Sequence, residues 1–317
     1  MNRMKTLAAA LSLAAFTSGA LAQQPLPAPL EPVYVGGQQP VREQAEQKGK
    51  VVQDGIEVRP MSKLRVLTSE RQVEQQSKQQ YLTMMQQAQQ KGALVPANHP
   101  QTLRLRAIAR RIIPHATRWN PAAAKWDWQV NLVHSDQVNA FCMPGGRVGF
   151  FSGILTKLRL TDDEVAAIMG HEIAHALREH GREQMGKSMA TSVGARLGGA
   201  VLASLFGIDP GITDTVAQYG AQFASLKFSR DDEREADLIG LDLAARAGFD
   251  PRAGVSLWQK MAAHSRGAPP AWLSTHPGGS DRIAQMNAHM DVLLPLYARA
   301  KGVSTRNLPP YRTTAMN

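Results

Sequence analysis

The strongest constraint on this chain is an H-E-x-x-H pattern, His171-Glu-Ile-Ala-His175. In a helix, a spacing of four residues puts both imidazoles on one face, one turn apart, where they can share a tetrahedral zinc ion. Glu172 lies on the adjoining flank, within reach of the water that attacks a substrate. A surface helix with scattered histidine and glutamate is the competing interpretation, and few such helices carry this spacing by chance. The pattern therefore predicts a zinc site with Glu172 as general base.

The residues before the motif predict where its helix begins. Thr161-Asp-Asp-Glu164 fits a capping box, in which the threonine hydroxyl and the glutamate carboxylate each bind a free amide at the helix start. The helix is expected to start at about Asp162 and to run to Gly181, a residue suited to the left-handed conformation that ends helices. The motif then lies in the middle of the helix.

A catalytic zinc ion takes three protein ligands and keeps one position open, so a third ligand is needed. The sequence SRDDEREAD, from Ser229 to Asp237, opens a helix that continues to a stop at Gly248. Glu233 and Asp237 share one face of that helix. This spacing suggests Glu233 as third ligand and Asp237 as the carboxylate that orients a zinc-bound imidazole. Spacing alone does not separate these two from Glu235, and a solvated charged helix is the alternative.

The first residues have the composition of an export signal. Arg3 and Lys5 precede an apolar run, and Ala20-Leu-Ala22 is a small-x-small processing site. We expect a signal peptide that is cut after Ala22 and a periplasmic mature protein. A retained membrane anchor needs roughly 20 apolar residues, and this run is shorter.

The charge and the cysteine content narrow the function classes. Cys142 is the single cysteine, so the exported fold depends on its core and its metal rather than on a disulfide. Without Arg3 and Lys5, 34 basic and 26 acidic residues leave a net charge of about +8, which favours anionic membrane surfaces or acidic clients. Nucleic acid is disfavoured, because no zinc-finger, RNP or basic-helix pattern occurs.

The chain is expected to be α+β, mostly α, in four parts. After the signal peptide at 1–22, a leader at 23–68 is rich in Gln and Pro and has few apolar groups to bury, so it is expected to be flexible. A metallopeptidase domain at 69–300 and a C-terminal tail at 301–317 follow. Within the domain we expect helices at 69–91 and 100–113, a strand at 126–133, a β-hairpin turning at 144–146 and a helical hairpin formed by 189–208 with 213–225.

The apolar segment from Met189 to Ile208 is also long enough to be considered as a membrane span. A span would bury Arg196 in the bilayer at a cost of roughly 2.5 to 3.5 kcal/mol. A soluble hairpin packed through its Gly and Ala faces is therefore the preferred interpretation, with association with a membrane left open.

Three motifs, HEIAHALREH, SRDDEREAD and Ser274-Thr-His-Pro277 with Arg282-Ile283, resemble those of the LoiP/BepA/HtpX family of zinc metallopeptidases, which also contains the CAAX prenyl proteases. The resemblance covers roughly Tyr81 to Met290. It includes NAFCMPGGRVGFFSGIL, which is similar to the edge strand and turn beside that family's cleft. It implies a gluzincin-like helical zinc core with a small β-sheet flanking the active-site cleft.

The resemblance also implies roles for individual residues. His276 is expected near the metal, where it stabilises the oxyanion, closes the fourth zinc position, or only caps the last helix. Arg282 is expected to hold the substrate carbonyl or the oxyanion. His180 lies nearly opposite His171 on the helical wheel and is expected to have no metal role. The implied site is one Zn²⁺ per chain on His171, His175 and Glu233, with Glu172, His276 and Arg282 as catalytic residues and Asp237 behind the ligands.

The predicted function is a zinc endopeptidase that cleaves unfolded or misfolded envelope proteins, as periplasmic protein quality control. Val148 to Phe151 is expected to form an exposed edge strand, to which an extended substrate adds through backbone hydrogen bonds. The alternatives are an exopeptidase or a narrow-specificity processing peptidase, and a chaperone-like binding protein with a latent or shielded zinc site. Outer-membrane proteins are among the expected clients, and the oligomeric state is left open.

Overall fold

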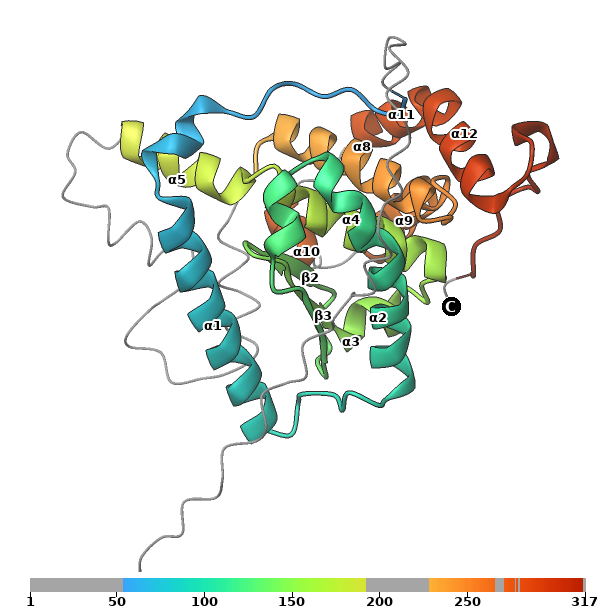
Figure 1. Ribbon diagram of the computed structural model, residues 1–317. Helices are drawn as coiled ribbons and strands as arrows, with labels where there is room; N and C mark the ends of the chain where they lie inside the picture. Colours follow the sequence, from blue (N-terminus) through green and yellow to red (C-terminus); the bar gives the residue numbers. More distant parts are fainter. Residues whose placement is uncertain (1–53, 192–227, 266–270, 277, 279, 316–317) are drawn as a thin grey trace, which may run out of the picture. The chain divides into compact units, whose positions relative to one another are not determined.

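The computed structural model describes residues 54–191, 228–265, 271–276, 278 and 280–315 (Figure 1). In this part the chain is mostly helical with one small sheet, so the predicted fold class is confirmed. The predicted signal peptide, most of the predicted leader and most of the predicted helical hairpin at 189–225 lie outside the described residues. Within the described ranges, no helix is long and apolar enough to cross a bilayer.

Several of the predicted helices are present close to their expected bounds. The helices expected at 69–91 and 100–113 are present, and the strand expected at 126–133 is present at its C-terminal end. The α-helices are α1 (Glu70–Gln90), α2 (Pro100–Ile112), α3 (Ser152–Lys157), α4 (Asp162–Leu177), α5 (His180–Thr191), α8 (Arg230–Arg246), α9 (Ala253–His264), α10 (Ala271–Thr275), α11 (Ser280–Ala288) and α12 (Met290–Lys301).

Helix α4, which carries the H-E-x-x-H motif, begins as predicted. Thr161 Oγ1 accepts a hydrogen bond from the Glu164 amide at 3.2 Å, and Glu164 Oε2 accepts one from the Thr161 amide at 2.8 Å. The predicted end at Gly181 is wrong. Glu179 adopts a positive φ of 56°, which breaks the helix after Leu177 and lets α5 start in a new direction at His180.

Helices α4 and α8 meet backbone to backbone, because each has a glycine at the contact. A Cβ on Gly170 would lie 2.4 Å from the carbonyl oxygen of Gly240, and a Cβ on Gly240 would lie 2.5 Å from the amide nitrogen of His171. No real side chain tolerates such distances. The two glycines therefore set the short separation of the helices that carry the metal-site residues.

The sheet has three strands in the order β1-β3-β2. β1 (Gln129–Val133) runs parallel to β3 (Arg147–Phe151), and β3 pairs antiparallel with β2 (Ala140–Met143). The turn between β2 and β3 contains Gly145 and Gly146, both with a φ of 84°, so the predicted hairpin is confirmed.

The expected exposed edge at Val148 to Phe151 is wrong. These residues belong to β3, the central strand, and all five residues of β3 are buried. The second strand of the hairpin, β3, also pairs with β1. The alternation of polar and apolar side chains along a strand does not predict such a pairing between distant segments. The free edge of the hairpin belongs to β2 instead.

The core lies between the sheet, α2, α4 and α8 (Figure 1). Helix α1 covers the hairpin through a smaller apolar cluster, which includes Tyr81, Met84 and Phe141. The Tyr81 hydroxyl donates to the Val148 carbonyl at 3.1 Å and accepts from Asn131 Nδ2 at 2.9 Å. The sparse apolar face of this helix thus packs on the sheet.

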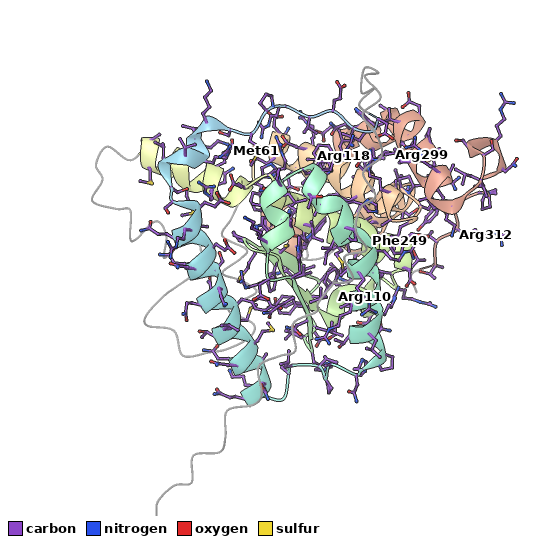
Figure 2. The ribbon with its side chains drawn as sticks, viewed as in Figure 1. Met61, Arg110, Arg118, Phe249, Arg299 and Arg312 are labelled. Carbon is purple, nitrogen blue, oxygen red and sulfur yellow. The ribbon has the colours of Figure 1, made fainter. Side chains whose placement is uncertain are left out.

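Residues 54–68, which were expected to belong to a flexible leader, pack on the domain. Ile56 is 1% exposed. Asp54 forms ion pairs with Arg118, Arg246 and Arg299, two of which are labelled in Figure 2. Composition predicted flexibility because it counts apolar groups, whereas this segment buries Ile56 in the core and adds charged contacts to residues far along the chain.

Candidate metal centre

Four buried side chains converge where α4 and α8 cross. His171 and His175 come from α4, Glu233 from the first turn of α8, and His276 from the residue after α10. One donor atom from each lies within 4.8 Å of the donors of the other three. The structure therefore brings together the three predicted ligands and His276, which was predicted to lie near the metal.

The donor atoms fit a tetrahedral zinc ion. Bonds of 2.0–2.1 Å require tetrahedral donors to lie about 3.3 Å apart. The Nε2 atoms of His171 and His175 are 3.1 Å apart, and the Glu233 carboxylate lies 3.5 Å from the first and 3.4 Å from the second. His276 Nδ1 lies 3.1 Å from His171 Nε2, in reach of the fourth position.

Asp237 and Arg282 support this donor set from behind. Asp237 Oδ1 lies 3.0 Å from Nδ1 of His171, which leaves the Nε2 of that ring for the metal. Arg282 donates to both oxygens of Asp237 at 2.6 Å and lies 2.7 Å from Glu233 Oε2. Burial opposes ionisation of Asp237, but the Arg282 guanidinium holds the pKa of this carboxyl below its usual value.

The electrostatics favour the protonation states that a metal needs. Burial, followed by the neighbouring imidazoles, holds the pKa of His175 well below its usual value, so this ring is neutral. Burial opposes ionisation of Glu233, but His276 and His171 hold the pKa of Glu233 below its usual value. The surroundings thus favour a neutral His175 ring and an ionised Glu233 carboxylate.

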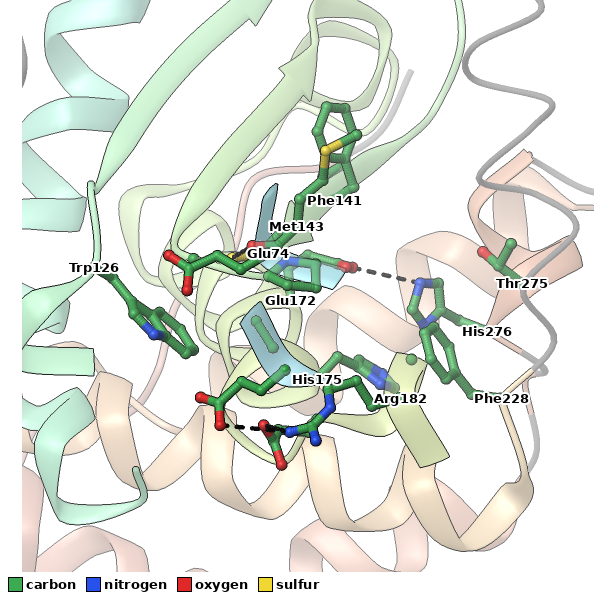
Figure 3. A pocket seen from close by; sticks show the side chains of 18 of the residues that line it. Glu74, Trp126, Phe141, Met143, Glu172, His175, Arg182, Phe228, Thr275 and His276 are labelled. Atoms are coloured by element: carbon green, nitrogen blue, oxygen red, sulfur yellow. Dashed lines mark hydrogen bonds and ion pairs between the residues drawn. The ribbon is translucent and has the colours of Figure 1, made fainter. Parts of the chain in front are cut away.

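Glu172 lies beside the donor set and faces a pocket (Figure 3). Its Oε1 accepts a hydrogen bond from Trp272 Nε1 at 2.6 Å and lies 3.6 Å from Nε2 of His276. The indole fixes the carboxylate while leaving its second oxygen for other partners. Burial lowers the pKa of His276, but the Glu233 and Glu172 carboxylates outweigh burial and raise it above its usual value.

The pocket runs between the sheet edge and the start of α5. The edge strand β2 lines one side with Ala140 to Met143, while Phe228 and Thr275 line the side next to His276. Trp126 and Glu74 line the opposite side (Figure 3). The residues of β2 and Glu172 thus line the same pocket.

Arg282 lies elsewhere than expected. It is not among the described residues that line the pocket, it is 2% exposed, and it stacks on the Trp258 ring. Its contacts with Glu233 and Asp237 place it behind the ligands rather than toward a substrate carbonyl. The motif that contains His276 and Arg282 predicted that Arg282 lies near the metal, but it did not predict which way the side chain points.

Two residues at this site were not predicted from the sequence. Trp272 binds Glu172, and no pattern in the sequence marks a tryptophan for that role. His180 lies with Nδ1 2.9 Å from Nδ1 of His175. A single continuous helix places His180 on another face, so only the break at Glu179 would have revealed the contact.

The H-E-x-x-H helix, the carboxylate helix packed against it and the pocket together define a metallopeptidase. The model of peptidase family M48 matches residues 99–290. The chain belongs to this family, and the resemblance seen in the three motifs is confirmed.

Curated relatives agree with this assignment. The chain is 36% identical over 170 residues to "Mitochondrial metalloendopeptidase OMA1" of Arabidopsis thaliana, which is 53% of this chain and 33% of that protein. It is 30% identical over 239 residues to the protein of the same name in Saccharomyces cerevisiae, 72% of this chain and 66% of that protein. It is 29% identical over 224 residues to "Beta-barrel assembly-enhancing protease" of Escherichia coli, 67% of this chain and 44% of that protein.

Proposed function

We propose that this chain is a zinc-dependent endopeptidase that hydrolyses peptide bonds in unfolded or misfolded envelope proteins. The observation that carries the proposal is the buried set of His171, His175 and Glu233, spaced as a tetrahedral ion requires, with Glu172 beside it at a pocket. The relatives that share this family are named as metalloendopeptidases and as a protease.

The chain's own residues supply most of the chemistry. A zinc ion would polarise the peptide carbonyl and acidify the attacking water. Glu172 takes a proton from that water and passes it to the leaving amine, while Trp272 holds its carboxylate in place. Asp237 keeps the His171 ring oriented, and Arg282 neutralises the two buried carboxylates behind the ligands.

His276 keeps two roles in this proposal. Its Nδ1 lies 3.0 Å from Glu233 Oε1, so it can close the fourth metal position, and its Nε2 faces Glu172, so it can support a developing negative charge. Replacing His276 with alanine distinguishes the two roles. Loss of a ligand that closes the metal site would raise the rate of peptide hydrolysis, whereas loss of charge stabilisation would lower it.

The edge strand β2 supports an extended substrate. β2 pairs with β3 along one of its two edges and lies at the end of the sheet. The residues of β2 also line the pocket beside Glu172. Backbone hydrogen bonds along such an edge recognise any unfolded segment with little regard to its sequence. This is why we propose unfolded chains as substrates, with envelope or outer-membrane proteins as clients.

The periplasmic assignment rests on the sequence before Ala22 and on one group of relatives. The bacterial relatives are named for β-barrel assembly, whereas the OMA1 relatives are named as mitochondrial. Amino-terminal sequencing of the mature protein tests the assignment, and we expect Gln23 as its first residue. A mature protein that still begins at Met1 in the membrane fraction would contradict it.

The first experiment on function is digestion of unfolded casein by the mature chain. The matched control is Glu172→Gln, which keeps the size of the side chain and removes the base. We expect fragments from the wild type, a rate about 10²- to 10⁴-fold lower for the variant, and equal zinc content in both.

Other outcomes point to the alternative functions. Only dipeptides or single residues as products would favour an exopeptidase, and cleavage of one folded protein alone would favour a narrow processing peptidase. Intact casein bound to a zinc-loaded protein, even after replacement of His276, would favour a chaperone-like binding protein.

A further inference from the structure

His180 is a buried histidine that the proposed mechanism does not use. It is 1% exposed and begins α5, directly after the helix break at Glu179. Its Nδ1 lies 2.9 Å from Nδ1 of His175. The Nε2 of His175 faces the other donors, so its Nδ1 is the nitrogen left for an orienting contact.

The direction of the hydrogen bond follows from metal binding. A ring nitrogen that binds a metal carries no proton, so the neutral His175 ring keeps its proton on Nδ1 and donates it to Nδ1 of His180. His180 must then carry its own proton on Nε2. That nitrogen lies 3.7 Å from Oε1 of Glu235, which is too long for a hydrogen bond but close enough for electrostatic attraction.

Glu235 is itself held in place by two arginines. Arg178 Nε donates to Glu235 Oε1, and Arg59 Nε donates to Oε2 at 2.8 Å. The two arginines are also linked, because Arg178 Nη2 donates to the Arg59 carbonyl at 2.6 Å. The carboxylate therefore cannot turn away from His180 without losing both partners.

The two zinc-binding histidines are thus supported differently. His171 is oriented by the charged carboxylate of Asp237, whereas His175 faces a second imidazole. We propose that His180 is a positioning residue for the metal ligand His175, and that Glu235, held by Arg178 and Arg59, fixes the tautomer of His180. This rests on the proposed function, since it requires His175 to bind zinc.

The test compares His180→Leu with His180→Asn in the Glu172→Gln chain, which prevents self-cleavage. Leucine fills the space without an acceptor, whereas the asparagine oxygen lies near the position of Nδ1 and still accepts from His175. Zinc affinity is measured by competition with a chromophoric chelator, and the visible spectrum of the cobalt-substituted protein reports the ligand geometry. His134→Leu, at an exposed histidine, is the control.

We expect His180→Leu to weaken zinc binding about 10- to 100-fold and to change the cobalt spectrum. His180→Asn is expected to restore most of the affinity and the wild-type spectrum. Arg59→Gln, on a side chain that is 41% exposed and easily replaced, is expected to shift the affinity in the same direction by a smaller factor.

Three results would overturn the inference in distinguishable ways. Wild-type affinity and spectrum in both His180 variants would remove the positioning role and leave the proposed function intact. Equal loss in the leucine and asparagine variants would mean that His180 only fills space. Failure of the Glu172→Gln parent to bind zinc would remove the proposed function together with the inference.

Discussion

At the scale of single residues, the site is a set of buried charges that stabilise one another. Glu233 and Asp237 are almost completely buried, and one guanidinium, that of Arg282, contacts both. Removing one partner of such a set leaves the others in a medium that solvates charge poorly. The candidate metal site and the stability of the fold are therefore expected to depend on the same side chains.

Arg282→Met tests this dependence. We expect it to lower the free energy of unfolding by about 3–5 kcal/mol, because two buried carboxylates lose their counter-charge. Arg234→Met is the matched control, since Arg234 is 38% exposed and forms surface ion pairs that contribute about 1 kcal/mol at most. Urea denaturation measures both, and equal small losses would show that the Arg282 contacts add no stability.

At the scale of elements, the sequence predicted the helices better than the strand order. The capping box at Thr161 and the motif at His171 are local patterns, and local patterns predicted α4 and its start correctly. The place of Val148 to Phe151 in the sheet depends on β1, which lies earlier in the chain and pairs with β3 in parallel. The break at Glu179 was also missed, because nothing in its residue type favours a positive φ.

The contact between α4 and α8 gives a prediction for Gly240→Ala. The added Cβ would lie 2.5 Å from the His171 amide nitrogen, so the helices must separate. We expect a loss of stability of about 1–3 kcal/mol and weaker zinc binding, measured by thermal unfolding and chelator competition. Gly181→Ala is the control, because an added Cβ there has no atom within 4 Å apart from those of its chain neighbours and its own helix backbone, and a gain or no change is expected.

Helix α1 gives a prediction about substrate preference. Glu74 lines the pocket opposite His276, next to Trp126 (Figure 3), and it has no ion-pair partner among the described residues. A carboxylate beside an indole ring attracts a Lys or Arg side chain. We expect Glu74→Gln to lower kcat/KM about 10-fold for peptides with lysine near the cleaved bond.

The control for this prediction is a peptide series that differs only in lysine or leucine at each position around the cleaved bond. Leucine peptides should be cleaved equally by the wild type and Glu74→Gln. A parallel fall for both kinds of peptide would show that Glu74 acts on the structure of α1 rather than on the substrate.

At the scale of the whole molecule, segments from both ends of the described chain pack against the helices of the site. Residues 54–60 reach α8 through Arg59, and the C-terminal tail reaches the start of α4. Tyr311 bonds Thr161, and Thr314 accepts a hydrogen bond from Lys260, which also donates to Glu164. The composition of the two segments did not predict that they pack on the domain. The polar contacts that hold them join residues far apart in sequence.

A chain that ends at Leu308 tests the role of the tail. We expect its free energy of unfolding to fall by roughly 1–3 kcal/mol, because a few hydrogen bonds at the start of α4 are lost. Zinc affinity is expected to stay unchanged, since His171 lies more than two turns further along the helix. Calorimetry and chelator competition on the same samples check both, and a parallel loss of affinity would contradict the prediction.

The glycine contact between α4 and α8 also determines which part of the site can move. Three of the candidate donors lie on two helices whose backbones touch, so the contact fixes their positions relative to one another. His276 instead follows the short helix α10, outside that contact. We therefore expect any opening of the site during turnover on the His276 side, while the donors on α4 and α8 keep their positions.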